Sequence, residues 1–233
     1  MIKKYNNLLV TGDLHLGDVV FDFERELIDI IKSEKFDGIV FGGDTFDTWR
    51  SKRSIKTIIA RYHLLFKALQ RLDSDIIFIK GNHDPKIDVL KSYGFEVMNN
   101  CSYVNANDQQ VKIIHGHEFD RAVKHARFVW KQLAFVEEMI NRLIKQVDKD
   151  SHIRLRSLLG KKSELKQFIK NFYKVILGYS DMDILLFGHT HVPLDGEEND
   201  LKFYNWGAWT KDYGFKPSYI IDSPTEIGNY YVE

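Results

Sequence analysis

The chain has 233 residues, 44% of them hydrophobic and 28% charged, which is ordinary for a folded globular protein. Its 33 Lys and Arg balance 33 Asp and Glu, so overall charge does not indicate a nucleic-acid or membrane partner. The single cysteine, Cys101, excludes an internal disulfide framework and fits a reducing compartment. No apolar stretch approaches the length of a signal peptide core or a membrane span. We therefore expect a cytoplasmic enzyme or binding protein, with peripheral membrane association as the open alternative.

The N-terminal third of the chain alternates between apolar strands and amphipathic helices. Short buried strands that run into glycine and polar residues are expected in residues 6–13, 36–44 and 74–84. Residues 23–34 and 55–72 between them have helical spacing of their apolar side chains. This order predicts parallel strands joined by right-handed crossovers.

Later apolar runs follow one another without helices between them. Further strands are expected in residues 95–100, 101–107, 111–117, 183–191, 202–209, 217–223 and 228–233. Their close spacing predicts a sheet that becomes mixed or antiparallel. We expect a single α/β domain over residues 1–233, with no internal repeat.

Residues 120–178 interrupt this pattern and predict a helical insertion or cap within the domain. Residues 128–147 and 163–177 both have helical patterns, and residues 121–174 hold fourteen Lys or Arg against five Asp or Glu. The local charge is therefore +9, and the rest of the chain carries −9. A solvated helix pair over the core, a substrate lid and an oligomer contact remain alternative interpretations.

Potential metal ligands follow the expected strands. Six of the nine histidines lie in glycine-flanked stretches at strand ends, and carboxylates or an amide accompany them. The candidates in chain order are Asp13 and His15, Asp44, Asn82, His83 and Asp84, His115 and His117, and His189 and His191. Because open α/β sheets bind ligands outside the carboxyl ends of their strands, these groups can converge.

This ligand set has a chemical meaning. Carboxylate, imidazole and amide groups suit Mn²⁺, Fe²⁺ or Zn²⁺, and the lack of thiolates argues against a structural zinc site. These candidates are too many for one ion. They fit two ions about 3.5–4 Å apart that share a bridging carboxylate, the arrangement used for phosphoryl chemistry.

The ordered motifs GDLH, GGD, GNHD, HGH and GHTH resemble those of the calcineurin-like metallophosphoesterase superfamily. The resemblance spans residues 12–191 and implies a four-layer αββα sandwich with a dinuclear site at its rim. It implies that one ion is bound by Asp13, His15 and His191. It implies that the other is bound by Asn82, His115 and His189, with Asp44 bridging. His83 would face the substrate without binding metal, oriented by Asp84.

A narrower set of motifs is similar to the UDP-2,3-diacylglucosamine hydrolase branch. These are GGDTFDTW, YNWGAW and a helical insertion after HGHEFD. That branch cleaves a pyrophosphate in lipid A synthesis and has a basic helical lid. This chain differs at His83, where the branch has Arg, and in HGH, where it has HGD. The substrate therefore stays open between a lipid-linked pyrophosphate and other phosphodiesters.

The function expected from this pattern is hydrolysis of a phosphodiester or pyrophosphate by a metal-bound hydroxide, with two divalent ions, Mn²⁺ first among them. His83 would stabilise developing charge or protonate the leaving oxygen. His117, Arg121 and Lys124 are candidate substrate-binding residues. Trp49, Trp206 and Trp209 lie near the motifs. We expect them to pack within the fold rather than to stack on the substrate.

Two alternatives use the same fold differently. A metal-dependent nuclease would hold nucleic acid with the basic insertion, and its binding would weaken steeply with salt. A non-catalytic scaffold would keep the fold without the chemistry, but the full ligand set argues against it. The expected partner is a phosphorylated small molecule or lipid-linked substrate, and homo-oligomers through the insertion remain open.

Overall fold

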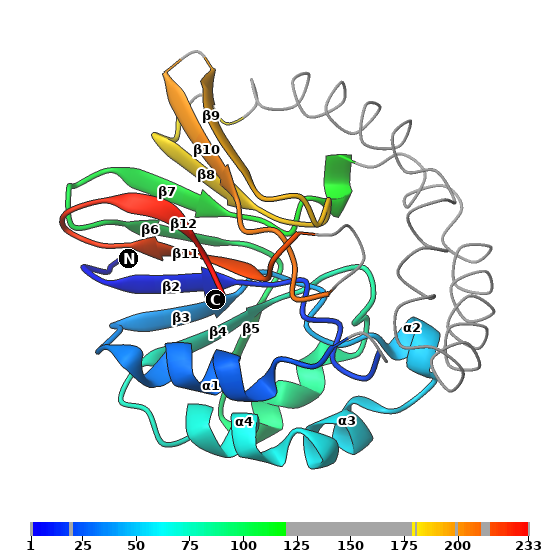
Figure 1. Ribbon diagram of the computed structural model, residues 1–233. Coiled ribbons are helices and arrows are strands. Elements are labelled where there is room, and N and C mark those ends of the chain that lie inside the picture. The colour runs from blue at the N-terminus through cyan, green and yellow to red at the C-terminus, as the bar shows by residue number, and fades with distance from the viewer. Residues whose placement is uncertain are drawn as a thin grey trace.

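Two six-stranded β-sheets pack face to face at the centre of the protein (Figure 1). The computed structural model describes residues 2–18, 21–119, 179, 181–198, 200–210 and 215–232. Sheet 1 has the strand order β12-β11-β2-β3-β4-β5, and sheet 2 has the order β1-β6-β7-β8-β10-β9. The α/β sandwich expected from the sequence is therefore confirmed. The helical insertion expected at 120–178 lies outside the described residues.

Sheet 1 has a parallel half and an antiparallel edge. Its strands are β2 (Leu8–Thr11), β3 (Gly38–Phe41), β4 (Asp75–Ile79), β5 (Glu96–Met98), β11 (Ser218–Asp222) and β12 (Ile227–Tyr231). Strands β2 to β5 pair in parallel, as the alternation of strand and helix predicts. From the C-terminal part of the chain, β11 joins β2 in antiparallel pairing and β12 follows it.

Sheet 2 is mixed and contains two strands that the sequence pattern did not indicate. Its strands are β1 (Lys3–Lys4), β6 (Cys101–Val104), β7 (Gln110–Ile113), β8 (Ile184–Phe187), β9 (Leu194–Glu198) and β10 (Leu201–Asn205). Both missed strands, β1 and β9, lie at sheet edges and are largely exposed, so they lack an apolar run.

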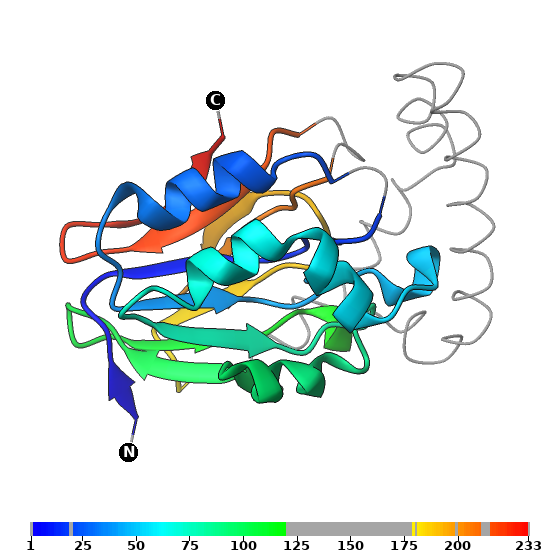
Figure 2. The same cartoon turned by 90° about the horizontal axis from the view of Figure 1, so that it is seen from below.

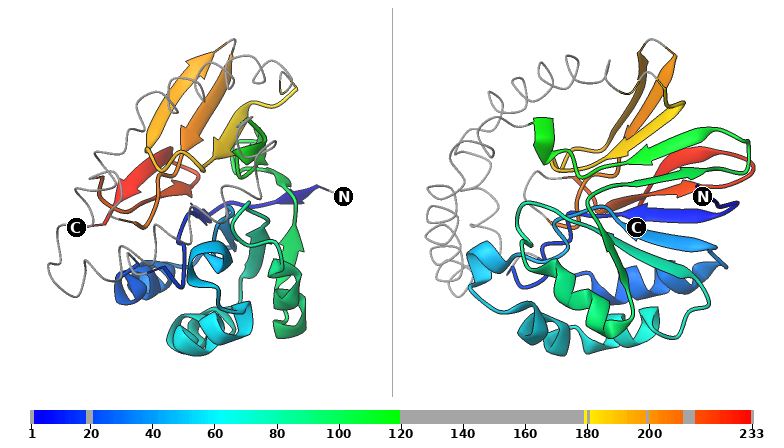
Figure 3. Two further views of the ribbon diagram at one scale, coloured as in Figure 1. Left: turned by 90° about the vertical axis from the view of Figure 1, so that its right-hand side faces the viewer. Right: turned by 180° about the vertical axis from the view of Figure 1, so that it is seen from behind.

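Helices cover the outer face of sheet 1 (Figures 2 and 3). The helices on this face are α1 (Glu24–Ser33), α3 (Ile55–Arg61) and α4 (His63–Leu69). The short helix α2 (Thr48–Ser51) follows β3, the 3₁₀ turn η1 (Ile87–Tyr93) follows β4, and the 3₁₀ turn η2 (His117–Phe119) follows β7 of sheet 2. The single helix predicted over residues 55–72 is wrong, because it divides at Tyr62. The φ and ψ angles there are −100° and 38°, and the buried ring packs edge-on against Phe21. Tertiary packing therefore interrupts a run of continuous helical spacing.

Alternating side chains along each strand build separate layers of core. Leu9, Ile39 and Phe78 face the helices, whereas Val10 and Val40 face sheet 2. This is the two-residue period of a strand buried on both sides. On sheet 2, alternate residues of β8 and β10 join a third apolar cluster that includes Phe119. Within the described residues, no helix is long and apolar enough to cross a membrane.

Candidate metal centre

Five loops carry the candidate ligands, and each follows a central strand. The parallel strands β2, β3 and β4 of sheet 1 are followed by Asp13 and His15, by Asp44, and by Asn82. The parallel strands β7 and β8 of sheet 2 are followed by His115 and by His189 and His191. Parallel strands bring their carboxyl ends to one edge of a sheet, so loops far apart in sequence meet there.

One group of ligand atoms combines the first and last of these loops. The Nε2 atoms of His15 and His191 lie 3.1 Å apart, and His191 Nε2 is 3.4 Å from Asp13 Oδ1. Asp13 and His15 are buried, and His191 is 9% exposed. Burial alone would raise the pKa of Asp13, but His191 and His115 hold it below its ordinary value. The carboxylate is thus ionised and faces two imidazole nitrogens.

A second group gathers ligands from the middle of the chain. Asp44, His115 and His189 place one ligand atom each within 4.8 Å of one another. The Nε2 atom of His115 also lies 3.1 Å from Asn82 Oδ1. Burial lowers the pKa of His115, but the ionised Asp44 beside it raises that pKa to about 10.

Asp44 stands between the two groups. Its Oδ2 lies 3.3 Å from His115 Nε2 and 4.0 Å from His15 Nε2, so it faces one imidazole of each group. Its Oδ1 accepts a hydrogen bond of 2.8 Å from the backbone N–H of His83. Burial would raise the pKa of Asp44, but His115 and His83 hold it well below the ordinary value. The residues expected to bind two ions, with Asp44 shared, are therefore brought together.

The backbone at these loops is strained. Asp13, His15, Asp44, His189 and His191 all have φ between 47° and 71°. This left-handed region is uncommon for residues other than glycine and clusters at functional sites. The one-residue gap within GDLH and GHTH therefore does not reflect the side-chain alternation of an extended strand. Sharp turns after the strands direct both side chains inward instead.

Trp206 packs against glycines of the ligand loops and contacts Asp13. A Cβ atom placed on Gly12, Gly42 or Gly188 would come within 2.7, 2.3 or 2.4 Å of its ring, so glycine at these strand ends makes room for the indole. Its Nε1 donates a hydrogen bond of 2.9 Å to Asp13 Oδ2, which also accepts from the N–H of His189. The expectation that Trp206 packs rather than stacks on substrate is confirmed.

His83 is held by the stretch 47–49. Its Nδ1 lies 3.2 Å from Asp47 Oδ2, and the Trp49 ring stacks on it at 4.4 Å between centroids. Its backbone carbonyl accepts hydrogen bonds from the N–H and hydroxyl of Thr48. The side chain is 14% exposed, so it reaches the surface of the centre. One ring nitrogen of His83 also lies within 4.8 Å of a ligand atom of His15 and of a ligand atom of Asp44.

The expected orientation of His83 by Asp84 is wrong, because Asp47 is the carboxylate that contacts the ring. Asp84 instead accepts hydrogen bonds from the backbone N–H groups of Thr45 and Gly81, at 3.0 and 2.8 Å. Burial, with Asp44 nearby, raises its pKa to about 7. Asp84 thus ties the second and third loops together. Asp47 stood within the GGDTFDTW motif, but the strand-end pattern alone did not mark it.

The candidate substrate-binding residues divide in two. The His117 ring centroid lies 5.2 Å from that of His115 and 6.4 Å from that of His189, so this histidine belongs to the rim of the centre. Burial and the neighbouring His115 lower its pKa to about 4, which keeps it neutral at physiological pH. Arg121 and Lys124 lie outside the described residues.

The donor set fits a divalent metal. Among the described residues, Asp13 Oδ1 is buried without a hydrogen-bond donor, although buried carboxylate oxygens normally have one. It faces imidazole nitrogens, and the centre contains no thiolate within its ligand groups. Mixed oxygen and imidazole ligands suit Mn²⁺, Fe²⁺ or Zn²⁺. An ion between these atoms would satisfy the oxygen and relieve the close approach of like ligands.

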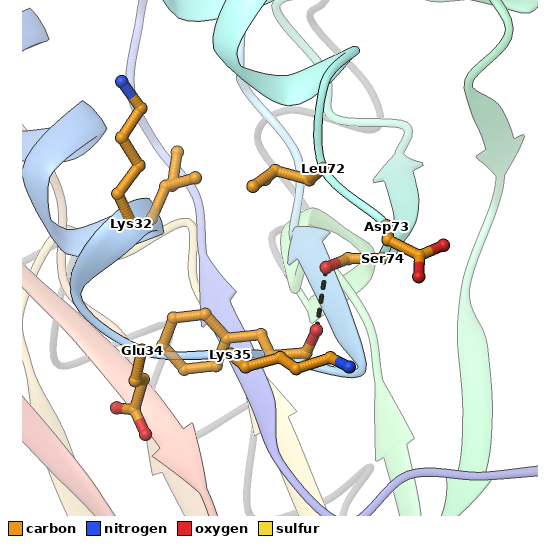
Figure 4. A pocket seen from close by; sticks show the side chains of 8 residues that line it. Lys32, Glu34, Lys35, Leu72, Asp73 and Ser74 are labelled. Carbon is orange, nitrogen blue, oxygen red and sulfur yellow. Dashed lines mark hydrogen bonds between the residues drawn. The ribbon is translucent and has the colours of Figure 1, made fainter.

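A separate hollow lies at the opposite edge of sheet 1 (Figure 4). It is lined by residues that precede β3 and β4: Ile31, Lys32, Glu34, Lys35, Phe36, Leu72, Asp73 and Ser74. The Ser74 hydroxyl donates to the carbonyl of Phe36 across it. None of these lining residues belongs to the candidate ligand groups, so the hollow is independent of the metal centre.

Known proteins resemble this chain in sequence or in fold. A UDP-2,3-diacylglucosamine hydrolase of Wigglesworthia glossinidia brevipalpis is 25% identical over 201 residues, which cover 79% of each chain. The structure of an archaeal phosphodiesterase aligns with a TM-score of 0.54 and 17% identity over 97% of this chain and 99% of that one, so it shares the fold. The family model of the calcineurin-like phosphoesterases matches residues 7–193. The chain therefore belongs to the calcineurin-like phosphoesterase family and is a hydrolase of phosphoric esters.

Proposed function

We propose that the protein hydrolyses a phosphodiester or pyrophosphate bond with two divalent metal ions, Mn²⁺ in the first instance. Asp13, His15 and His191 would hold one ion, and Asn82, His115 and His189 the other. Asp44 would bridge them. The ions would supply an activated water and positive charge opposite the phosphate oxygens.

The observation that carries this proposal is the position of Asp44. One carboxylate oxygen, Oδ2, faces His115 of one ligand group and His15 of the other. A shared, ionised oxygen between two sets of imidazole nitrogens is what a bridged pair of ions requires. The buried Asp13 Oδ1 and the left-handed backbone at five ligands support the same interpretation.

His83 would act on the leaving group. Its Nδ1 lies 3.2 Å from Asp47 Oδ2, and we assign Nε2 as the nitrogen that donates a proton to the departing oxygen. Trp49 covers one face of the ring and restricts its rotation. A histidine held from two sides is suited to proton transfer, because its position no longer depends on solvent.

The substrate we propose is a lipid-linked pyrophosphate of the kind that the name of the Wigglesworthia hydrolase states. The support is the match over 79% of both chains and the motifs GGDTFDTW and YNWGAW, which resemble those of this branch. Because His83 and the HGH motif depart from that branch, a simpler phosphodiester is the second candidate. The archaeal neighbour, by its name a phosphodiesterase, is consistent with that alternative.

The test is a substrate comparison with the Mn²⁺-loaded protein. Bis-p-nitrophenyl phosphate, UDP-2,3-diacylglucosamine and single-stranded DNA are assayed in parallel, and bound metal is counted by elemental analysis. We expect two ions per chain and a kcat/KM for the UDP lipid at least about tenfold above that for the chromogenic diester. DNA as the best substrate would favour the nuclease. Two bound ions without hydrolysis of any substrate would favour a scaffold.

A further inference from the structure

The buried Arg50 contacts Asp47, and Asp47 in turn contacts the proposed metal ligand His15. Helix α2 begins after Asp47, whose Oδ1 accepts a hydrogen bond of 2.8 Å from the backbone N–H of Arg50. The other oxygen, Oδ2, lies 3.2 Å from three nitrogens: His15 Nδ1, His83 Nδ1 and Arg50 Nη1. One carboxylate oxygen therefore faces a candidate metal ligand, the candidate proton donor and a guanidinium together.

Arg50 has a second partner in a different loop. Its Nη1 lies 3.3 Å from Oδ2 of Asp18, and the Asp18 and Asp47 side chains are fully buried. Asp18 follows β2, and its backbone N–H donates to the carbonyl of His15. The Asp47 N–H in turn donates to the carbonyl of Leu16. The guanidinium thus spans the loop that carries His15 and the segment that holds His83.

The two buried carboxylates of Asp18 and Asp47 require a cationic partner, which Arg50 provides. A carboxylate without solvent must be paired, and loss of its cationic partner is strongly destabilising. Nη1 of the planar guanidinium carries two N–H donors in fixed directions, so this one nitrogen can serve both Asp18 and Asp47. A lysine ammonium is a compact point charge on a flexible stem and does not reproduce that geometry.

The placement of Asp47 has consequences at both imidazoles. Contact at Nδ1 fixes the direction of each ring and leaves Nε2 for its partner. At His15, Nε2 faces His191 and Asp44. At His83, the same contact sets the nitrogen proposed to protonate the leaving group. A shift of Asp47 would therefore disturb metal binding and turnover together.

We propose that Arg50 is a positioning residue that acts through Asp47 on His15 and His83, with Asp18 as its second anchor. The inference rests on the proposed function, because it assigns His15 to metal binding and His83 to proton transfer. Arg50 itself touches neither substrate nor metal in this scheme.

The test compares Arg50→Gln with the matched control Arg61→Gln, since Arg61 is an exposed arginine of α3. Mn²⁺ affinity of the metal-stripped protein is measured by calorimetry, and kcat and KM with bis-p-nitrophenyl phosphate. We expect Arg50→Gln to lose about 10- to 100-fold in Mn²⁺ affinity and at least about tenfold in kcat, the range for partners of metal ligands. The KM should change by less than about threefold, because the diester is bound by the ions.

A double variant separates positioning from a general structural role. In an Asp47→Asn background, Arg50→Gln should cause less than about a twofold further loss of kcat, because both changes break one chain of contacts. Multiplicative losses would overturn the inference. So would a folded Arg50→Gln whose affinity and kcat stay within about twofold of the parent protein.

Two further variants keep the test decisive if Arg50→Gln does not fold. Arg50→Lys keeps the charge, and Asp18→Asn removes the second anchor. Both must weaken Mn²⁺ binding by at least about threefold for the inference to stand. The affinity arm does not need turnover. A parent protein that binds Mn²⁺ without hydrolysing any substrate would therefore contradict the proposed function, and the role of Arg50 would still be decided.

Discussion

Buried carboxylates occur at both ends of the β-sandwich, but their surroundings differ. At the carboxyl ends of the central strands, Asp13 and Asp44 face imidazole nitrogens, and Asp13 Oδ1 is without a donor among the described residues. At the opposite end, Asp222 pairs across the sheets with sheet 2. Tyr103 donates to its Oδ2 at 2.6 Å, and Asn105 donates to its Oδ1 at 3.3 Å.

The comparison of Asp222 with Asp13 and Asp44 shows which structural property distinguishes the candidate metal centre from a buried structural carboxyl group. Asp222 is as deeply buried as Asp44, so burial does not distinguish the two. The backbone and the hydrogen bonds do. The ligand loops use left-handed residues and leave an acceptor facing other acceptors, whereas Asp222 ends a regular strand with both oxygens satisfied. We expect substitutions at the carboxyl ends of the central strands to alter metal binding and turnover, and substitutions around Asp222 to alter stability.

The largest effect is expected from Asp44→Ala. Because its Oδ2 is proposed to bridge both ions, its loss should abolish hydrolysis and leave fewer than two ions bound per chain. Elemental analysis after gel filtration measures the metal content. Asp88→Ala is the control, because Asp88 forms exposed ion pairs with Lys80 and Lys91. Two bound ions in the Asp44 variant would contradict the bridging assignment.

A smaller loss is expected from His83→Ala. Both ions should remain, and kcat should fall about 100-fold or more, which is typical of an acid–base group. His63→Ala on the exposed surface of α4 serves as the control. Loss of metal from the His83 variant would make this residue a ligand, which its proximity to His15 and Asp44 also permits.

The candidate ligands at the carboxyl ends of the strands could be predicted from the sequence, but the buried residues Asp47 and Arg50 behind them could not. Asp13, His115 and His191 could be found because each follows an apolar strand and carries a metal-binding group. The order of β2 to β5 followed from alternating periodicity in the same way. Asp47 and Arg50 could not be found so, because a short helix outside any strand places them. Their roles depend on contacts across the fold, which local spacing does not encode.

The edge strands and the break at Tyr62 were missed for a related reason. Strand β9 gains its hydrogen bonds from β10, so its own sequence needs no apolar run. Tyr62 lies in continuous helical spacing and turns because its ring packs on Phe21. Local propensity is a weak prior in both places, and tertiary contacts decide the outcome.

An intermediate effect is expected from Trp206→Phe. The change keeps an aromatic ring beside the glycines but removes the Nε1 donor to Asp13. Mn²⁺ affinity should fall about tenfold, as for other partners of metal ligands. Trp209→Phe is a matched control, because Trp209 is equally buried and donates to Thr11 instead. If both variants lose affinity equally, packing rather than orientation of Asp13 explains the effect.

The smallest effect on activity, with a clear effect on stability, is expected from Tyr103→Phe. This change removes a donor from buried Asp222 and should lower the free energy of unfolding by about 1–3 kcal/mol while leaving kcat unchanged. Tyr5→Phe is the control, because the Tyr5 hydroxyl donates to the half-exposed Asp75 and its loss should cost less. Chemical denaturation in the presence of a chelator gives the unfolding free energies.

The pH dependence makes this last expectation specific to Asp222. Burial raises the pKa of Asp222, while Tyr103 and Asn105 lower it in part, so the folded state favours the protonated acid. Its contribution to stability is complete below the ordinary pKa of about 3.9 and is lost as pH rises through the folded value. Without the Tyr103 hydroxyl the folded pKa rises further, so the loss extends to higher pH. The deficit of Tyr103→Phe relative to the parent should therefore be larger at about pH 8 than at about pH 5. A deficit that is constant with pH would mean that the hydroxyl contributes packing alone, and the contrast between the hydrogen-bonded carboxyl group of Asp222 and Asp13 would then fail.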